Sequence, residues 1–368
     1  MRFVLYFVVF GETFTLSYLL MPLLTRLALR WNVVDKPGQR KIHQKSKPLL
    51  GGVGIFSSFF LVVVGNILGF EILRRANGIP ASLQTMVRVS PMLSAVLPKL
   101  VLILAGGFLI HLLGLLDDVF KEKLSYKLKF VVQIAVVLIV AFAGVRTSFM
   151  PGRTLDVLIT TLWIVGITNS FNLLDNLDGL TAGISVISAA IFFAIAVLQG
   201  QIFFAFILAA LAGTSFGFLL RNFHPSKLFM GDSGSLFLGY IFGALSVTGS
   251  YVVDSSASHL PVLMPILVLS IPLYDTFSVM FIRWREGRPL FLGDKRHFSH
   301  RLLELGMSHR NAVVFIYLVS FCVGIAAVLL PYVSLAASVL LLTQAVIVYV
   351  LITILITHGH RALNRSQA

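Results

Sequence analysis

The chain has 368 residues, of which 57% are hydrophobic and 12% are charged, and its mean hydropathy is +0.93. Apolar stretches of about 18 or more residues recur from end to end, which excludes an ordinary soluble domain and predicts an all-α polytopic membrane protein. A single cysteine, Cys322, excludes an internal disulfide framework and a thiolate zinc site.

Eleven apolar segments are predicted to span the membrane within one integral-membrane domain, residues 1–368. They lie near residues 3–24, 51–73, 98–116, 128–145, 155–171, 180–199, 202–220, 234–252, 260–282, 312–331 and 334–356. If the N-terminus is periplasmic, most Lys and Arg fall in the cytoplasmic loops and the C-terminal tail, as the positive-inside rule requires. The same asymmetry accounts for the formal net charge of +14, so we expect no nucleic-acid partner.

The acidic residues gather on the same predicted side of the membrane as the basic residues, although no insertion rule requires it. The chain has 15 Asp and Glu, and most of them lie in or beside the predicted cytoplasmic loops. A charged, water-soluble substrate needs a membrane face that gathers both acids and bases, so we place the active site on the cytoplasmic face. Asp275, close to Pro272 in the ninth predicted span, lies deeper.

Three glycines, Gly51, Gly52 and Gly54, open the second predicted span. Without a Cβ they could let the backbone approach a ligand closely. By itself this is a weak indication, because a glycine-rich turn at a helix start is common.

Adjacent Asp117 and Asp118 end the third predicted span. If the helix continues, Lys121 lies one turn beyond Asp117 on the same face, where the two side chains could simply form an ion pair. Two carboxylates at the end of a membrane span are costly, however, and that cost favours a role in catalysis or metal binding.

The segment NSFNLLDNLDGL, residues 169–180, follows the fifth predicted span and concentrates acid and amide side chains. These are Asn169, Asn172, Asp175, Asn176 and Asp178. The three Asn side chains share one face on helical spacing, and Gly179 could end the helix with a positive φ. A helix end needs one such polar residue rather than five, and carboxylate and amide oxygens are the ligands that Mg²⁺ prefers.

Asp232 begins the eighth predicted span, between Gly231 and Gly234 in the sequence FMGDSGS. We predict a tight turn that points its carboxylate to the cytoplasm, at a helix N-terminus that favours anions. Phe229 is either an interfacial aromatic or a stacking face for a base, and the sequence leaves both open.

The loop GDKRHFSHRL places His297 and His300 three residues apart, beside Arg301. Two His without a thiolate partner are a weak zinc signal. Among Lys and Arg they are more typical of a phosphate-binding cluster, with an ordinary basic cytoplasmic loop as the alternative.

These motifs, in this order, resemble the polyprenyl-phosphate N-acetylhexosamine-1-phosphate transferases of glycosyltransferase family 4. The resemblance rests on LLDD, NSFNLLDNLDGL, FMGDSGS and KRHFSHRL, and it runs from Asp35 to about Ala312. It implies that a UDP-N-acetylhexosamine gives its sugar 1-phosphate to undecaprenyl phosphate, a membrane lipid, with release of UMP. It also implies a multi-pass protein of the bacterial inner membrane that uses Mg²⁺, or alternatively Mn²⁺, and it leaves a homodimer open.

The resemblance assigns roles to individual residues. Asp232 is the implied principal Mg²⁺ ligand and Asn172 the second, and Asp117 or Asp118 orients or deprotonates the lipid phosphate. For substrate binding, it implies uracil stacking on Phe229, a nucleotide wall of Asp175, Asn176 and Asp178, phosphate binding by Lys121 and Lys129, and diphosphate binding by His297, His300 and Arg301. Direct attack is favoured over a covalent aspartyl-phosphate, because a phosphate monoester is already largely deprotonated near neutrality.

One departure concerns the histidine loop, which reads His-x-His-His in the non-muramoyl branch, whereas Ser299 replaces the middle His here. The branch of phospho-N-acetylmuramoyl-pentapeptide transferases carries a run of consecutive His, also absent here, and ranks second. A secondary transporter is the alternative from another class, and only Asp275 fits the midplane site that it requires.

Overall fold

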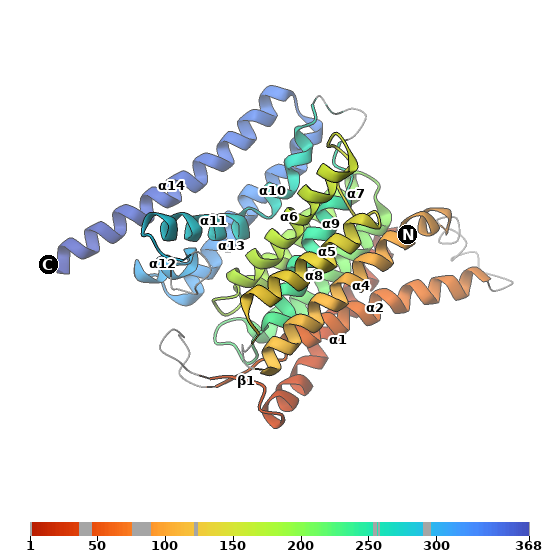
Figure 1. Ribbon diagram of the computed structural model, residues 1–368, viewed down its shortest axis with the longest axis horizontal. Helices are drawn as coiled ribbons and strands as arrows, with labels where there is room; N and C mark the ends of the chain where they lie inside the picture. The colour runs from red at the N-terminus through yellow and green to blue at the C-terminus, as the bar shows by residue number, and fades with distance from the viewer. Residues whose placement is uncertain are drawn as a thin grey trace.

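The computed structural model describes residues 2–36, 46–75, 90–120, 124–252, 256, 258–289 and 296–367, and it is almost entirely helical (Figure 1). Side chains are described over the same ranges, apart from residues 2, 74–75, 90–95 and 360–367. The one sheet in this part of the chain has two short antiparallel strands, β1 (Val34–Asp35) and β2 (Lys47–Pro48). The predicted all-α class is confirmed.

Every predicted apolar segment is helical in the structure. The helices are α1 (Arg2–Arg30), α2 (Gly51–Arg75), α4 (Ser90–Phe120), α5 (Tyr126–Phe142), α6 (Arg153–Leu174), α7 (Leu180–Leu198), α8 (Ile202–Asn222), α9 (Asp232–Thr248), η1 (Leu260–Leu263), α10 (Met264–Val268), α11 (Ser270–Arg285), α12 (Phe298–Glu304), α13 (His309–Leu329), η2 (Leu330–Tyr332) and α14 (Leu335–Gln367). Among the described residues, eight helices are long and apolar enough to cross a membrane, or nine if one bent pair counts as a span. The protein is therefore a polytopic membrane protein.

Helix α9 forms the centre of the bundle, and α2, α4 and α6 pack around it (Figure 1). Every residue from Ser233 to Ser246 is buried, as expected of a helix that is apolar on all sides. Glycines permit its close contacts: a Cβ on Gly114 of α4 would lie 2.4 Å from the backbone oxygen of Asp232. Small residues at crossings are how membrane helices approach closely.

The ninth predicted span is not the single straight helix that its apolar length suggested. The η1–α10 segment and α11 meet at Leu269 with a bend of 75°. Pro272 has no N–H to give to the Val268 carbonyl four residues earlier, and Ser188 Oγ donates to that carbonyl instead, at 3.3 Å. After the bend, α11 packs against α6 and α13.

The glycines at the start of α2 let protein backbone, rather than a ligand, come close. Gly51 N–H donates to the Phe229 carbonyl at 3.0 Å and Gly52 N–H to the Met230 carbonyl at 2.8 Å. A Cβ on Gly52 would lie 2.1 Å from the Gly234 nitrogen. These contacts tie the start of α2 to the segment before α9.

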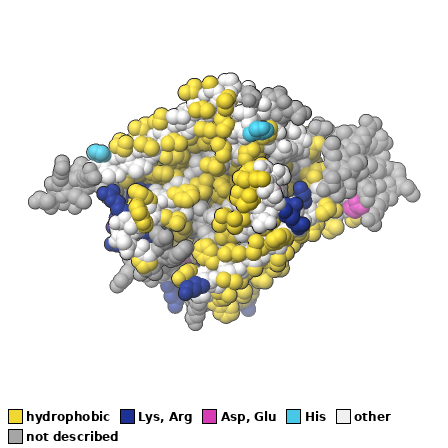
Figure 2. All heavy atoms as spheres, turned by 45° about the horizontal axis from the view of Figure 1, so that its top comes forward, with side chains coloured by type: hydrophobic (Ala, Val, Ile, Leu, Met, Phe, Trp, Pro, Cys, Tyr) yellow, Lys and Arg dark blue, Asp and Glu magenta, His cyan; other side chains and the backbone are white. Residues whose placement is uncertain are grey.

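The outer surface is mostly hydrophobic in the view of Figure 2, with Lys and Arg in a few separate places. Helix α14 runs along the edge of the bundle, and its C-terminal end projects beyond it (Figure 1). Large apolar side chains on α14 are exposed, such as Leu340 at 70% and Leu355 at 68%. A lipid-facing surface accounts for this exposure.

Gly114→Ala is expected to destabilise the protein by about 1–3 kcal/mol, because the new methyl group would force α4 away from the Asp232 backbone. Gly166→Ala is the matched control, since nothing lies within 4 Å of the added Cβ on that α6 glycine. It should leave stability unchanged or raise it by up to about 1 kcal/mol. Thermal unfolding in detergent micelles measures both, and equal melting temperatures for the two variants would contradict this packing.

Candidate active site

The predicted motifs meet at one end of the helical bundle. The C-terminal ends of α4 and α6 lie beside the N-terminal ends of α5 and α9, because neighbouring helices run in opposite directions. Side chains that are far apart in the sequence therefore contact one another there: Lys129 reaches Asp232, 103 residues further along the chain.

Lys129 joins two carboxylates at the centre of the site. Its Nζ donates to Asp117 Oδ2 at 2.9 Å and to Asp232 Oδ2 at 2.8 Å. The Asp117 side chain is 2% exposed, whereas those of Lys129 and Asp232 are 21% and 25% exposed. Lys121, the predicted helical neighbour of Asp117, lies outside the described residues.

Asn172 extends this network from α6. Its Nδ2 donates to Asp232 Oδ1 at 2.8 Å and to Ser235 Oγ at 3.0 Å. The amide donates through Nδ2, so Oδ1 is the atom that is able to bind a cation. Asn169, predicted on the same face, instead donates to Gln133 Oε1 at 2.6 Å and lies deeper in the bundle.

The N-terminus of α9 binds an anion, as predicted, and that anion belongs to the protein. Asp118 Oδ1 accepts from the Asp232 N–H at 2.8 Å, and Asp118 Oδ2 accepts from the Ser233 N–H at 3.0 Å. Gly231, with φ at +71°, makes this contact close, since a Cβ there would lie 2.5 Å from Asp118 Oδ2. Asp118 is 6% exposed and holds the backbone that carries Asp232.

The loop between α6 and α7 differs from the predicted helix end. Helix α6 ends at Leu174 with Asp175 as its C-cap, so Asn176 does not continue the helical face of Asn172. Gly179 has the predicted positive φ, +81°, but it precedes the start of α7 rather than ending α6. Burial, together with the negative charge of Asp232, raises the pKa of the Asp175 carboxyl to about 7.

Asp178 turns away from the Lys129 network. Its Oδ2 accepts from His224 Nδ1 at 2.9 Å and from the Ser226 N–H at 3.0 Å. Burial by itself would raise the pKa of Asp178, but the hydrogen bonds from Ser226 and His224 outweigh it and lower that pKa below its usual value. The five polar residues of this motif therefore lie in different local environments rather than at one shared site.

The histidine loop is anchored to α11 through Asp275. His297 Nδ1 lies 2.8 Å from Asp275 Oδ2, and the Phe298 N–H donates to Asp275 Oδ1 at 2.6 Å. An ionised carboxylate can only accept, so His297 carries its proton on Nδ1 in this pair. The sequence left Asp275 as a candidate transport residue, whereas the structure makes it the support of His297.

Arg301 and Ser299 belong to the same loop. Arg301 Nη2 donates to Ser278 Oγ at 2.7 Å, and its buried Nε has no hydrogen-bond partner within the described part of the chain. Ser299, 1% exposed, donates to Asn176 Oδ1 at 2.5 Å. The residue in place of the middle His thus links the histidine loop to the loop between α6 and α7. The ring of His300 lies 6.3 Å from that of His297.

Phe229 is half-buried beside β2. Its N–H donates to the Pro48 carbonyl at 2.8 Å, and Lys47 Nζ lies 6.0 Å from the centre of its ring. The backbone of this segment is therefore held by β2 and the start of α2, which leaves the ring beside a basic side chain.

Two residues of the site were missed by sequence reasoning: Ser235 and Asn222. Asn222 Oδ1 accepts from the Gly179 N–H at 2.9 Å, and its Nδ2 donates to the Leu228 carbonyl at 2.9 Å. Buried polar groups need such partners. A buried amide as the last residue of α8 was a signal that could have found Asn222, whereas nothing local marks Ser235.

Comparison with known proteins shows the family of the chain. Residues 100–250 match the model of glycosyl transferase family 4. A probable undecaprenyl-phosphate N-acetylglucosaminyl 1-phosphate transferase of Bacillus subtilis is 36% identical over 85% of this chain and 81% of its own length. The chain belongs to glycosyl transferase family 4.

Other relatives in the family come from different branches. A decaprenyl-phosphate N-acetylglucosaminephosphotransferase of Mycolicibacterium smegmatis is 31% identical over 89% of this chain and 83% of its own length. A phospho-N-acetylmuramoyl-pentapeptide-transferase of Desulforamulus reducens is 28% identical over 87% of this chain and 92% of its own length. The resemblance predicted from the motifs is confirmed, with the muramoyl branch at lower identity.

Asp275→Asn is expected to destabilise this member of the family by about 1–3 kcal/mol. An amide offers one acceptor oxygen, so it cannot serve both His297 Nδ1 and the Phe298 N–H. Amide hydrogen exchange should rise over residues 297–304. Glu286→Gln is the control, because the ion pairs of Glu286 with Arg288 and Arg296 lie at the surface. Unchanged exchange in Asp275→Asn would contradict the anchoring role.

Asp175→Asn is expected to alter the dependence of stability on pH. The folded pKa of about 7 exceeds the unfolded value of about 3.9, so the folded state holds this proton more tightly. The resulting stabilisation is complete below about pH 4 and is lost as the pH rises through about 7. The melting temperature of the wild type should therefore fall more steeply between pH 5 and pH 8 than that of Asp175→Asn. Identical slopes would show that Asp175 is ionised throughout.

Proposed function

We propose that the protein transfers N-acetylhexosamine 1-phosphate from a UDP-sugar to undecaprenyl phosphate and so begins a lipid-linked cell-envelope glycan. The observation that carries this proposal is the network of Asp117, Lys129, Asp232 and Asn172, which joins three separate motifs at one end of the bundle. The names of the Bacillus subtilis and Mycolicibacterium smegmatis relatives, which both specify N-acetylglucosamine and a polyprenyl phosphate, support the same donor and acceptor classes.

In this proposal all eleven apolar segments belong to the membrane-embedded part, and the site faces the cytoplasm of a bacterial cell. The distribution of Lys and Arg supports this orientation, with a periplasmic N-terminus. Helices α5 and α9 have 17 residues each, which is near the lower limit for a span. The cytoplasmic face is where a UDP-sugar and the head of a lipid phosphate can meet.

The donor atoms at the site suit Mg²⁺, or alternatively Mn²⁺. Asp232 and Asn172 present a carboxylate and an amide within hydrogen-bond distance of each other, and Asp117 adds a second carboxylate beside Lys129. Hard cations select such oxygen ligands and share them with substrate phosphates. Asp232 would be the principal ligand and Asn172 the second, and the metal would neutralise charge on the diphosphate.

Within this site, the transfer needs positioning more than activation. An oxygen of the lipid phosphate attacks the phosphorus that carries the sugar and forms a new P–O bond. The bond from that phosphorus to the oxygen bridging the two UDP phosphates breaks, and UMP leaves with this oxygen. Lys129 offsets the negative charge of the phosphates, and Asp117 orients the attacking group. Asp118 acts on the backbone of Asp232 and not on substrate.

The two remaining groups of residues would bind the nucleotide and its diphosphate. Phe229 would stack on the uracil, and Asp175 with Asn176 would face the uridine. His297, His300 and Arg301 would bind the diphosphate. Asp275 supports His297, and Ser299 joins this loop to the nucleotide side through Asn176.

Purified protein with Mg²⁺, undecaprenyl phosphate and a panel of UDP-N-acetylhexosamines should release UMP with at least one donor. Asp232→Ala should reduce the rate by at least about 10²-fold, because it removes the proposed principal ligand of the Mg²⁺ that would neutralise charge on the diphosphate. Glu12→Gln is the control, since Glu12 lies in α1 and bonds to the Asn66 amide. If no donor in the panel released UMP, the proposal would be wrong.

The same panel distinguishes the second candidate, a phospho-N-acetylmuramoyl-pentapeptide transferase, which the 28% identical relative represents. UMP release with only UDP-N-acetylmuramoyl-pentapeptide would support it. The absence of a run of consecutive His in His297-Phe298-Ser299-His300 argues against that branch.

A further inference from the structure

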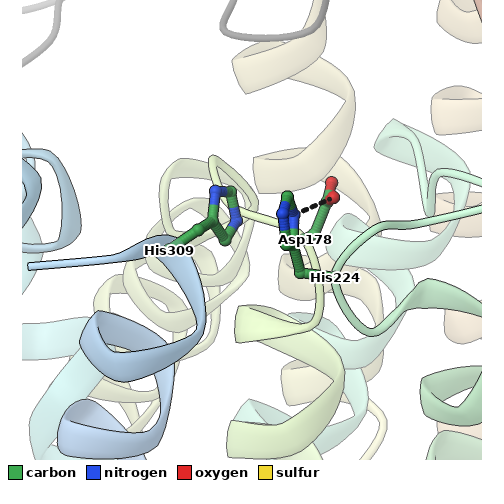
Figure 3. Close-up of side chains that lie close together, drawn as sticks. All are labelled: Asp178, His224 and His309. Carbon is green, nitrogen blue, oxygen red and sulfur yellow. Dashed lines mark hydrogen bonds and ion pairs between the residues drawn. The ribbon is translucent and has the colours of Figure 1, made fainter.

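A second cluster of metal-ligating side chains lies outside the Lys129 network. It consists of Asp178, His224 and His309, and Figure 3 shows the three side chains beside one another. Asp178 comes from the loop between α6 and α7, His224 from the segment before α9, and His309 is the first residue of α13. Three segments that are distant in sequence therefore converge at one place.

The geometry is close to that of a ligand set. One potential ligand atom from each residue lies within 4.8 Å of the other two. Asp178 Oδ2 and His224 Nδ1 are 2.9 Å apart, and the rings of His224 and His309 stack at 4.2 Å with an angle of 16° between their planes. The Asp178 carboxylate is already oriented by the Ser226 N–H.

An ordinary hydrogen-bonded pair of Asp and His accounts for only two of these residues. His309 Nε2 is buried, and no hydrogen-bond partner for it exists in the part of the chain that the structure describes. A buried polar atom without a partner is uncommon in folded proteins and calls for an explanation. A ligand that binds all three side chains would supply one.

We propose that Asp178, His224 and His309 form a binding site for a divalent transition metal, with Zn²⁺ as the fitting ion. Imidazole nitrogens and one carboxylate suit Zn²⁺, whereas Mg²⁺ prefers oxygen ligands throughout. Three protein ligands leave a fourth tetrahedral position for water or another donor. This site is separate from the proposed Mg²⁺ ligands and does not depend on the proposed transferase activity.

Binding requires a small rearrangement of the cluster. Ligand bonds of about 2.0–2.2 Å place the donor atoms of a tetrahedral site roughly 3.4 Å apart. Separations of up to 4.8 Å must therefore shorten towards this value, while the 2.9 Å pair of Asp178 Oδ2 and His224 Nδ1 must lengthen. The His224 side chain is 42% exposed, so it can rotate without disturbing the core.

A metal at this place would restrain the loop that carries Asp175 and Asn176. Tyr317 of α13 already donates a hydrogen bond to the Gly179 carbonyl, and Asn222 accepts from the Gly179 N–H. Zn²⁺ would add a direct link from His309 of α13 to Asp178 of the same loop. The site would thus cross-link α13 to the loop between α6 and α7, which carries Asp175 and Asn176.

The test uses full-length protein without a polyhistidine tag, freed of metal with a chelator and titrated with Zn²⁺ in excess Mg²⁺. The wild type should bind one equivalent of Zn²⁺. His224→Ala and His309→Gln should each bind Zn²⁺ at least about tenfold more weakly than the wild type, because each loses a ligand. His259→Ala, at an exposed histidine that precedes η1, should bind like the wild type. Zn²⁺ should also raise the melting temperature of the wild type and of His259→Ala only.

Two further measurements keep the outcome decisive. Asp232→Asn should retain the Zn²⁺ equivalent, and Co²⁺ as a probe should give the intense visible bands of a four-coordinate site in the wild type. His224→Ala changes an exposed side chain, so it tests the site even if His309→Gln does not fold. Equal Zn²⁺ affinity in the wild type and His224→Ala, or loss of the equivalent in Asp232→Asn, would overturn the proposal. Neither result would bear on UMP release.

Discussion

The contact between Asp118 and the N-terminus of α9 is the constraint on which the rest of the site depends. Helix α9 is buried from Ser233 to Ser246, so the N–H groups of its first turn cannot all turn to water. The two Asp118 oxygens accept from Asp232 and Ser233 and bring the ends of α4 and α9 together. Asp232 is consequently held at the edge of the bundle with its carboxylate partly exposed.

The charge at this position follows from the same contact. Asp117, Asp118 and Asp232 bring three carboxylates together, and Lys129 bonds to two of them. A cluster with more carboxylates than ammonium groups has the oxygen donors that the proposed Mg²⁺ would need. The structure therefore brings together an acidic half, built on α4, α5, α6 and α9, and a basic half on α12, and Ser299 joins them through Asn176.

The bend after α10 places the basic half. Because α11 turns by 75° at Leu269, Asp275 can accept from both His297 and the Phe298 N–H while Arg301 reaches Ser278. A straight helix through Pro272 would require an N–H that proline lacks. The buried Asp275 is thereby explained as a support for the histidine loop, and the transporter hypothesis loses the one residue that favoured it.

The sequence by itself determined the helical segments and most of the residues that gather at the candidate site. Long apolar runs can form little else in a bilayer, and carboxylates such as Asp117 and Asp232 are too costly at span ends to be incidental. Only the tertiary structure decided their partners: Lys129 for Asp117, the backbone of α9 for Asp118, and His224 for Asp178. Helical spacing describes neighbours three or four residues apart, whereas these contacts join helices that run in opposite directions.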